Sequence, residues 1–285
     1  MDNNPNQNSG SSIEFSHKIL LPNFFIVGAN KAGTTSLYYY CSQHPEIFMA
    51  KAKEPMFFTA NTPPREQENI NKADKFDLYY QYFTLQEYLG LFETATEPIR
   101  GESSTIYLSH PDAAVWIRKI SPDSKIVAIL RNPIERAISD FEFQTKVNQT
   151  EKRTLSQAMN DSLNKRIDPS HQDLVFGNLS KSPGRYVNLG LYSSQIKRYK
   201  QYFPEKQLFI ADYEEYNTDT INFVKKIYSF LEVSDFTPNA NRLNTSGKSK
   251  PEVEKDLMSK MKDFFRDDIK QLQSLVSFDV MKWLD

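Results

Sequence analysis

The pattern of apolar and polar positions along the chain predicts short buried strands that alternate with amphipathic helices. Apolar runs predict strands at 24–27, 47–50, 125–130 and 207–211, and a strand followed by a turn is expected at 100–107. Helical spacing predicts helices at 35–42, 154–166, 191–203, 218–231 and 251–276. It also predicts one helix that begins at 84, one that ends at 120 and one that begins at 133. Repeated strand–helix alternation is typical of an α/β fold, in which helices cover both faces of a mostly parallel sheet.

Four segments carry residues that favour the start of a helix. Thr84 and Thr154 each precede a Glu or Gln by three positions, which is the capping-box spacing. Asn132 precedes a proline, a pair typical of the N-cap and the first helical position. The segment 109–112 offers a further N-cap before the helix that runs to 120. These signals predict where four of the helices begin.

The chain divides into a polar N-terminal tail and one domain. Residues 1–18 are rich in Asn and Ser and contain no apolar run, so they predict a disordered tail rather than a signal peptide. The longest apolar stretch, 19–29, is interrupted by Pro22 and Asn23 and falls short of the ~20 residues that a membrane helix needs. We therefore expect a single domain over 19–285, no membrane insertion and a cytoplasmic location; the oligomeric state stays open.

Composition and charge narrow the range of partners. The chain has 285 residues, 39% of them apolar, which is enough to bury a sizeable core. Lys and Arg number 35 against 36 Asp and Glu, a formal net charge of -1, so no overall basic field favours a nucleic acid polymer. The single cysteine, Cys41, excludes an internal disulfide and a cysteine-based metal cluster, and it fits a reducing compartment.

The turn after the first predicted strand has the composition of a phosphate-binding loop. Residues 28–36 read GANKAGTTS, and glycines at such a turn let backbone N–H groups surround an anion at a helix N-terminus. In the Walker A pattern the lysine directly follows the second glycine, whereas here Thr34 holds that position and Lys31 lies two residues before Gly33. The loop therefore resembles a P-loop without matching that of NTPases. An ordinary glycine-containing turn explains the glycines but not the lysine and the hydroxyl run.

A second group of polar residues follows the most apolar strand, 125–130. Arg131 comes at its carboxyl end, where open α/β sheets bind ligands, and Ser139 follows on the next helix. A guanidinium offers two parallel donors to a phosphate, and a serine hydroxyl adds another hydrogen bond. Alternatively, Arg131 pairs with a carboxylate and Ser139 is only a solvated helix residue. Two anion sites at one edge of a sheet favour the first interpretation.

Four segments taken together resemble the sulfotransferases that use 3'-phosphoadenosine-5'-phosphosulfate (PAPS), in particular the bacterial and heparan-sulfate-type branch. They are FIVGANKAGTTSL at 25–37, KEPMFF at 53–58, GESSTIYL at 101–108 and KIVAILRNPIERAISD at 125–140. The resemblance covers roughly 20–275, with the segments in the same order. It implies a P-loop-NTPase-like parallel α/β fold in a single domain, PAPS as the sulfuryl donor, 3'-phosphoadenosine-5'-phosphate (PAP) as the product, and no metal.

The resemblance also implies a role for individual residues in binding the nucleotide. The 5'-phosphosulfate would be held by the loop residues Lys31, Ala32, Gly33, Thr34, Thr35 and Ser36. The 3'-phosphate would be held by Arg131 and Ser139. Near the C-terminus, a loop that covers the cofactor would comprise Ser246, Gly247 and Lys248.

For catalysis, the resemblance implies that Glu54 removes the proton of the acceptor. Lys31 would stabilise the bridging oxygen while PAP leaves by in-line displacement at sulfur. The composition alone favours a solvated charge cluster of Glu54 with Lys51 and Lys53. His171 is the alternative base, since it lies in a predicted loop over the site, 168–186.

Five further residues are candidates for contact with the acceptor. They are Lys53, Phe57, Phe58, Ser103 and His171, although aromatic clusters are more often part of a core. Many glycan-modifying relatives carry a lysine where this chain has Ser103, which removes a cation from the expected acceptor site. We therefore expect a small-molecule acceptor, such as a natural product, with a hydroxyl or amine to be sulfated.

Three other functions stay open at this point. The first is sulfation of a glycan or glycolipid. The second is a P-loop nucleotide kinase or NTPase, because the run 208–212 resembles an apolar strand that ends in a magnesium-binding aspartate. The third is a nucleotide-binding module without catalytic activity. The position of Lys31 argues against the kinase.

Overall fold

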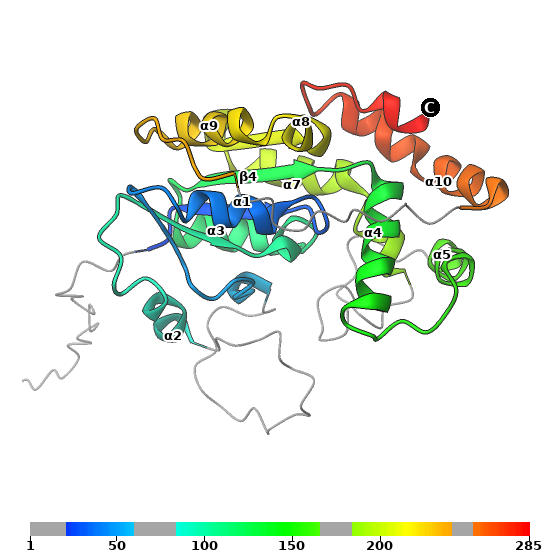
Figure 1. The fold of residues 1–285 in the computed structure, drawn as a ribbon, viewed down its shortest axis with the longest axis horizontal. Helices are drawn as coiled ribbons and strands as arrows, with labels where there is room; N and C mark the ends of the chain where they lie inside the picture. The colour runs from blue at the N-terminus through cyan, green and yellow to red at the C-terminus, as the bar shows by residue number, and fades with distance from the viewer. Residues whose placement is uncertain (1–20, 60–83, 166–183, 241–252) are drawn as a thin grey trace, which may run out of the picture.

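The core of the fold is a parallel sheet with the strand order β2-β3-β1-β4-β5. A computed structural model describes residues 21–59, 84–165, 184–240 and 253–285 of the chain (Figure 1). Within them, the sheet consists of β1 (Phe24–Gly28), β2 (Ile47–Met49), β3 (Ile99–Ser103), β4 (Lys125–Leu130) and β5 (Leu208–Asp212). The α/β fold and the parallel sheet predicted from the sequence are confirmed.

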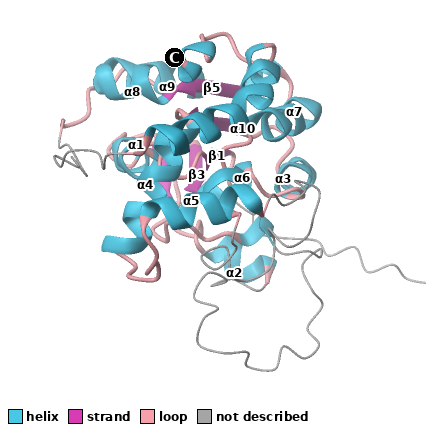
Figure 2. Ribbon diagram, turned by 90° about the vertical axis from the view of Figure 1, so that its right-hand side faces the viewer, coloured by secondary structure: helices cyan, strands magenta, loops and turns pink. Residues whose placement is uncertain are grey.

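Helices cover both faces of this sheet (Figure 2). On one face α1 (Thr34–Cys41) packs against α9 (Thr220–Leu231), and the Tyr228 hydroxyl donates to the Tyr40 carbonyl over 2.9 Å. On the other face α3 (Ala113–Ile120) packs against α7 (Tyr192–Tyr202). The central strand β1 is fully buried between them, which explains why it reads as a continuous apolar run rather than an alternating one.

A group of helices packs together beside the sheet. It consists of α4 (Pro133–Lys146), α5 (Leu155–Asn164), α6 (Arg185–Asn188) and α10 (Lys255–Gln273), and α10 also contacts α7. Two short helices lie elsewhere, α2 (Leu85–Gly90) and α8 (Tyr213–Thr218). Two 3-10 turns, η1 (Phe57–Thr59) and η2 (Thr105–Leu108), contact each other, and η2 also contacts β1.

Three of the four predicted helix starts form their side-chain caps. The hydroxyls of Thr84 and Thr154 accept hydrogen bonds from the backbone three residues later, at 3.1 and 3.2 Å. The Asn132 side chain accepts from the backbone of Ile134 at 3.0 Å. At the fourth start, Asp112 precedes α3 but its side chain forms no capping bond. All four segments therefore lie at the start of a helix, as predicted.

Two predicted elements differ from the structure. The helix predicted at 218–231 is present as α9 but begins two residues later, because Asp219 leaves the helical conformation with φ −137° and its carboxylate caps α9 by accepting from the Asn222 N–H at 3.3 Å. The loop predicted at 168–186 ends earlier than expected, since α6 begins at Arg185. The rest of that loop up to 183, and the predicted tail 1–18, lie outside the described residues.

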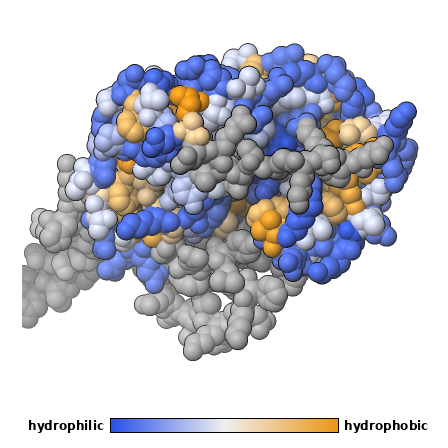
Figure 3. Space-filling model, in the orientation of Figure 1, coloured by the Kyte–Doolittle hydropathy of each residue, from blue (hydrophilic) through white to orange (hydrophobic). Residues whose placement is uncertain are grey.

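The surface shown in Figure 3 has apolar residues interspersed among polar ones. Of the described residues, the large apolar side chains that are most exposed are Tyr39, Val147 and Met281. None of the helices in the described ranges is long and apolar enough to cross a membrane. The only cysteine, Cys41, is buried, and this burial raises the pKa of its thiol.

Candidate active site

The carboxyl ends of three neighbouring strands meet at the edge of the sheet that carries the candidate residues. Strand β1 pairs with β3 on one side and with β4 on the other, so that Phe25 lies opposite both Glu102 and Ile126. The chain runs from β1 towards β2 on one side and later reaches β4 and β5 on the other. Such a change of direction is where parallel α/β sheets bind ligands.

The loop from β1 to α1 needs its glycines. A Cβ atom on Gly28 would lie 2.7 Å from the Cβ of Leu108 in η2. Gly33, the N-cap of α1, has a left-handed φ of 76°, and a Cβ there would lie 2.6 Å from the Tyr216 ring. The start of the loop therefore packs against η2, and its end, where α1 begins, packs against α8. Backbone N–H groups of the first turn have no partner within a helix and favour an anion.

Lys31 and Arg131 lie next to each other at this edge. The Arg131 guanidinium donates to the Lys31 carbonyl over 3.1 Å, although the two residues are 100 positions apart. The Lys31 ammonium lies 3.8 Å from the centre of the Phe143 ring, and the Arg131 guanidinium lies 4.8 Å from the centre of the Tyr213 ring. The two predicted anion-binding residues are thus brought together as expected.

The carboxylate pairing considered for Arg131 is also present. Its partner is Glu135, at 3.4 Å. Ser139 lies one turn further along α4 and is partly exposed, and its hydroxyl forms no hydrogen bond within the described ranges. The sequence interpretation of this pair as a phosphate site therefore remains a prediction that the geometry permits.

Positive charge exceeds negative charge around the Lys31 side chain. Burial lowers the pKa of Lys31, and the nearby guanidiniums of Arg131, Arg185 and Arg136 lower it further, whereas Asp140 raises it. Asp140 is fully buried; it accepts two hydrogen bonds from Arg185, at 2.8 and 2.9 Å, and pairs with Arg136 at 3.5 Å. A site with several cations and few anions attracts a multiply charged anionic ligand.

The other residues of the loop differ in what they present. Ser36 donates to the Gly33 carbonyl over 2.9 Å and its hydroxyl lies 2.5 Å from that of Tyr216, so it helps to close the loop. Ala32 is fully buried and its N–H donates to the Ala29 carbonyl at 3.2 Å. Thr34 is also buried, whereas Thr35 is partly exposed. The predicted contacts of Ala32 and Ser36 with a ligand are therefore in competition with bonds inside the protein.

Glu54 follows β2 in the chain and is bonded to residues at the carboxyl end of β3. Its N–H donates to the Ser103 carbonyl over 2.9 Å, and its carboxylate accepts from the Thr105 N–H at 2.8 Å and from the Thr105 hydroxyl at 3.1 Å. Lys53 pairs with it at 2.6 Å. The Glu54 side chain is 25% exposed. This carboxylate is held in place, unlike that of a solvated charge cluster.

Phe58 belongs to the core, the position that is more common for aromatic clusters. Its side chain is 2% exposed, because η1 turns it inward against the rings of Phe25 and Tyr107, at 5.8 and 5.6 Å. Phe57 is partly buried and stacks on Tyr88 at 4.3 Å. Ser103 is fully buried, and its hydroxyl has no hydrogen-bond partner within the described part of the chain. Four predicted site residues, His171, Ser246, Gly247 and Lys248, lie outside the described residues.

Several residues of the site were not predicted from the sequence. Tyr213 and Tyr216 follow β5 at its carboxyl end, the same position that drew attention to Arg131 after β4. Phe143 lies four residues after Ser139 and therefore on the same face of α4. Thr105 lies two residues after the end of β3. The rule that ligand-contacting residues follow the strands would have found three of these four.

Comparison with known proteins gives the family of this chain. A family model described as the sulfotransferase domain matches residues 21–281. The chain belongs to the sulfotransferase family. A solved sulfotransferase structure from Alicyclobacillus acidocaldarius is 31% identical, with a TM-score of 0.74 over 93% of this chain and 99% of that one. The family and the P-loop-NTPase-like fold implied by the resemblance are confirmed.

Curated relatives of this sulfotransferase-family chain are longer proteins. The human bifunctional heparan sulfate N-deacetylase/N-sulfotransferase 2 is 25% identical over 287 residues, which cover 90% of this chain and 30% of the relative. The membrane-associated sulfotransferase kil1 of Dictyostelium discoideum is 30% identical over 125 residues, 44% of this chain and 23% of the relative. The chain thus spans less than a third of the length of each of these two relatives.

Proposed function

We propose that this protein transfers the sulfuryl group of PAPS to a hydroxyl or amine of a small-molecule acceptor and releases PAP. The observation that carries the proposal is the contact of Arg131 with Lys31 at the edge where Glu54 also lies. PAPS is charged at both ends, and these cations lie at the meeting point of the loop and β4. Membership of the sulfotransferase family supports PAPS as the donor.

In this proposal the two cationic positions bind opposite ends of the nucleotide. The loop 28–36 holds the 5'-phosphosulfate with Lys31, with the hydroxyl of Thr35 and with N–H groups at the start of α1. Arg131 and Ser139 hold the 3'-phosphate, for which Arg131 exchanges its long 3.4 Å contact with Glu135 for a bidentate one.

The chemistry follows from these positions. The acceptor oxygen or nitrogen attacks sulfur while the bond from sulfur to the 5'-phosphate oxygen breaks in line with it. The proton of the acceptor passes to the Glu54 carboxylate, which Thr105 and Lys53 hold in a fixed orientation. The Lys31 ammonium stabilises the negative charge that develops on the bridging oxygen.

Two observations favour a small acceptor over a polyanionic glycan. Ser103 is fully buried and uncharged, at the position where the sequence resemblance placed a lysine in glycan-modifying relatives. The formal net charge of the chain is -1, which gives no long-range attraction for a polyanion. The single buried thiol of Cys41 suits a reducing compartment such as the cytoplasm.

The kinase or NTPase alternative has less support. Asp212, which resembled a magnesium-binding aspartate, pairs with Lys282 at 2.8 Å and caps α8 by accepting from the Glu214 N–H at 3.1 Å. The alternative of a module without catalytic activity offers no reason for the two Thr105 donors and the ion pair with Lys53 that orient Glu54.

A mass-spectrometric screen tests the proposal. The protein is incubated with PAPS, EDTA and a metabolite extract, and products are sought that have gained one sulfuryl group. We expect Glu54→Gln to lower turnover by about 10² to 10⁴ while PAP binding, measured by calorimetry, stays within about twofold. Glu93→Gln, on the exposed turn after α2, is the matched control and keeps full turnover.

Two results would contradict different parts of the proposal. Failure of the protein to bind PAP would overturn the assignment of the nucleotide. Wild-type turnover in Glu54→Gln would remove Glu54 from the role of base.

A further inference from the structure

A second carboxylate, that of Glu102, lies one residue before the end of β3 and is fully buried. It accepts three hydrogen bonds, from the hydroxyls of Tyr88 at 2.6 Å, Ser104 at 2.7 Å and Tyr107 at 2.9 Å. All three donors are neutral groups. A buried carboxylate that is bonded only to neutral donors is costly to keep in a core, so a functional reason for its presence is worth seeking.

Two of these hydroxyls also bind the segment that carries Glu54. The Ser104 hydroxyl oxygen accepts from the Met56 N–H at 3.0 Å, and the Tyr107 hydroxyl oxygen accepts from the Phe58 N–H at 3.3 Å. A hydroxyl has one proton to donate and lone pairs to accept with. When Ser104 and Tyr107 give their protons to Glu102, their oxygens are directed towards these two N–H groups.

The segment 54–58 has a backbone that needs such support. Glu54 has φ 60° and Met56 has φ 54°, both in the left-handed region that residues with a side chain avoid. Strained conformations of this kind persist only where surrounding contacts hold them, and they are common at active sites. The N–H groups bound by Ser104 and Tyr107 belong to Met56 itself and to the residue two positions later.

We propose that Glu102 is a positioning residue of the sulfuryl-transfer site, which orders the hydroxyls of Ser104 and Tyr107 so that they hold the Glu54 segment in its strained conformation. Glu102 does not touch the acceptor, because it is fully buried and its oxygens are used by three internal bonds. The inference rests on the proposed role of Glu54 as base.

The protonation of Glu102 supports this inference. Burial raises its pKa to about 7, the three hydroxyl bonds lower it, and the nearby Glu54 raises it. A protonated Glu102 must donate to one of its neighbours, which reverses one of the three hydrogen bonds. The titratable groups that face it are Tyr88, Tyr107, Tyr199 and Glu54. Ionisation of Glu102 near neutral pH therefore completes the hydrogen bonds that hold the segment.

Steady-state kinetics of single variants test the inference. We expect Glu102→Gln to lower kcat on the order of 10²-fold, the usual effect of a small misplacement of a catalytic group, with the Kd for PAP unchanged. Ser104→Ala and Tyr107→Phe remove one link each and give smaller losses of kcat. Glu93→Gln, on the exposed turn after α2, is again the control: it has no part in the Glu102 network and keeps full kcat.

Two further readouts separate positioning from a merely structural role. The kcat of the wild type rises with pH through about 7 as Glu102 ionises, and this rise is absent from Glu102→Gln. The double variant Glu54→Gln with Glu102→Gln loses no more activity than Glu54→Gln alone, because both changes act through one group. Ser104→Ala keeps the Glu102 carboxylate and is the variant that tests the inference if Glu102→Gln does not fold.

The outcomes distinguish this inference from the proposed function. If Glu54→Gln is inactive while Glu102→Gln and Ser104→Ala both keep wild-type kcat, the positioning role is overturned and the base stands. If Glu54→Gln keeps full turnover, the base is overturned and the positioning role with it. A loss of PAP binding in a folded Glu102→Gln would also count against a role confined to the base.

Discussion

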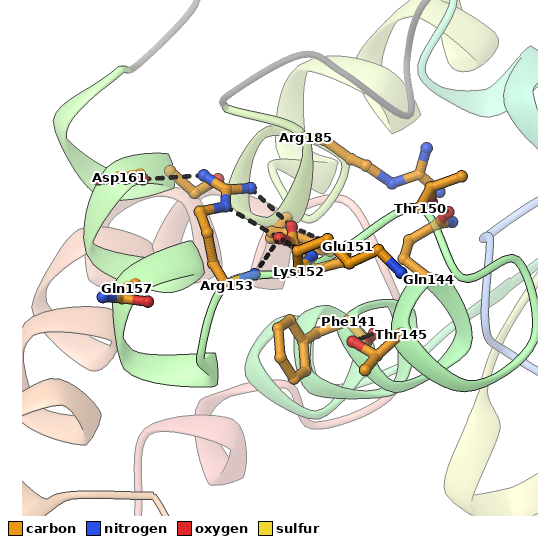
Figure 4. A network of polar contacts seen from close by, with 12 residues as sticks. Phe141, Gln144, Thr145, Thr150, Glu151, Lys152, Arg153, Gln157, Asp161 and Arg185 are labelled. Atoms are coloured by element: carbon orange, nitrogen blue, oxygen red, sulfur yellow. Dashed lines mark hydrogen bonds and ion pairs between the residues drawn. The ribbon is translucent and has the colours of Figure 1, made fainter.

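Glu102 and Glu151 are both largely buried carboxylates that accept several hydrogen bonds, but their donors differ in charge. Glu102 is bonded to three neutral hydroxyls, and burial raises its pKa to about 7. Glu151, between α4 and α5, accepts from the Arg153 guanidinium at 2.6 and 3.0 Å and from two backbone N–H groups at 2.9 Å (Figure 4). The hydrogen bonds from Arg153 lower the pKa of Glu151 to about 2.

Asp140 shows whether burial or the charge of the hydrogen-bond donor determines the direction of the pKa shift. It is as deeply buried as Glu102, and burial raises its pKa, yet the guanidiniums of Arg185 and Arg136 outweigh that effect and the pKa of Asp140 is lowered. The charge of the partner, and not the depth of burial, therefore determines whether a carboxylate of this protein stays ionised. Asp140 and Glu151 are structural anions, whereas Glu102 is poised to change its protonation near neutral pH.

The largest effect is expected from Asp140→Asn. Loss of this charge removes the buried carboxylate that Arg136 and Arg185 both contact, which lowers the free energy of unfolding at pH 7 by about 3–5 kcal/mol. Urea denaturation measures the change. In the double variant with Arg185→Met, part of the loss is recovered because the two changes affect one ion pair and are not additive. A loss below about 1 kcal/mol in Asp140→Asn would break the comparison.

Glu102 is expected to stabilise the fold only at low pH. Its pKa is about 7 in the folded protein against an ordinary value of 4.5, so the folded state holds the proton more tightly. The corresponding stabilisation is fully present below pH 4.5 and is lost as the pH rises through about 7. The difference in unfolding free energy between wild type and Glu102→Gln should fall by roughly 3 kcal/mol over this range. A difference that is flat with pH would contradict a raised pKa.

Glu151 is expected to show the opposite sign. Its pKa is about 2 in the folded protein against 4.5 ordinarily, so its stabilisation is fully present above pH 4.5 and is lost as the pH falls through about 2. At pH 7 we expect Glu151→Gln to cost about 1.5 kcal/mol. This is a low value for a charged hydrogen bond, because Arg153 is 37% exposed and solvent screens the pair. Chemical denaturation at pH 7 and pH 3 checks the sign.

The smallest effect is expected at an exposed ion pair. Lys146 and Glu142 lie 2.5 Å apart on α4, and the lysine side chain is 55% exposed. Lys146→Ala should change the free energy of unfolding by less than about 0.5 kcal/mol, and 0.5 M NaCl should remove most of that. A change above 1 kcal/mol would show that solvent exposure matters less than the comparison of the buried carboxylates suggests.

Some parts of the site could be predicted from the sequence because they depend on neighbouring residues. The apolar run of β4, the cap at Asn132 and the glycine turn before α1 are local signals, and the structure has all three. The rule that carboxyl ends of parallel strands share an edge then placed Lys31 beside Arg131 without any knowledge of their contact.

Other parts depended on contacts between distant residues. The aromatic residues at 53–58 favour a core position, but they do not indicate that Phe58 packs against Phe25, because that contact joins residues far apart in the sequence. Glu102 gave no signal either, since its partner Tyr88 is 14 residues away and lies on α2. Asp140 and Arg185 are separated by 45 residues. The sequence by itself determined the strands, the helix starts and the chemistry available at one edge of the sheet, because backbone preferences and hydrophobic periodicity act over a few residues. Only the tertiary structure decided which carboxylates are paired with cations and which are not, because burial and charge pairing depend on where the chain brings distant side chains together.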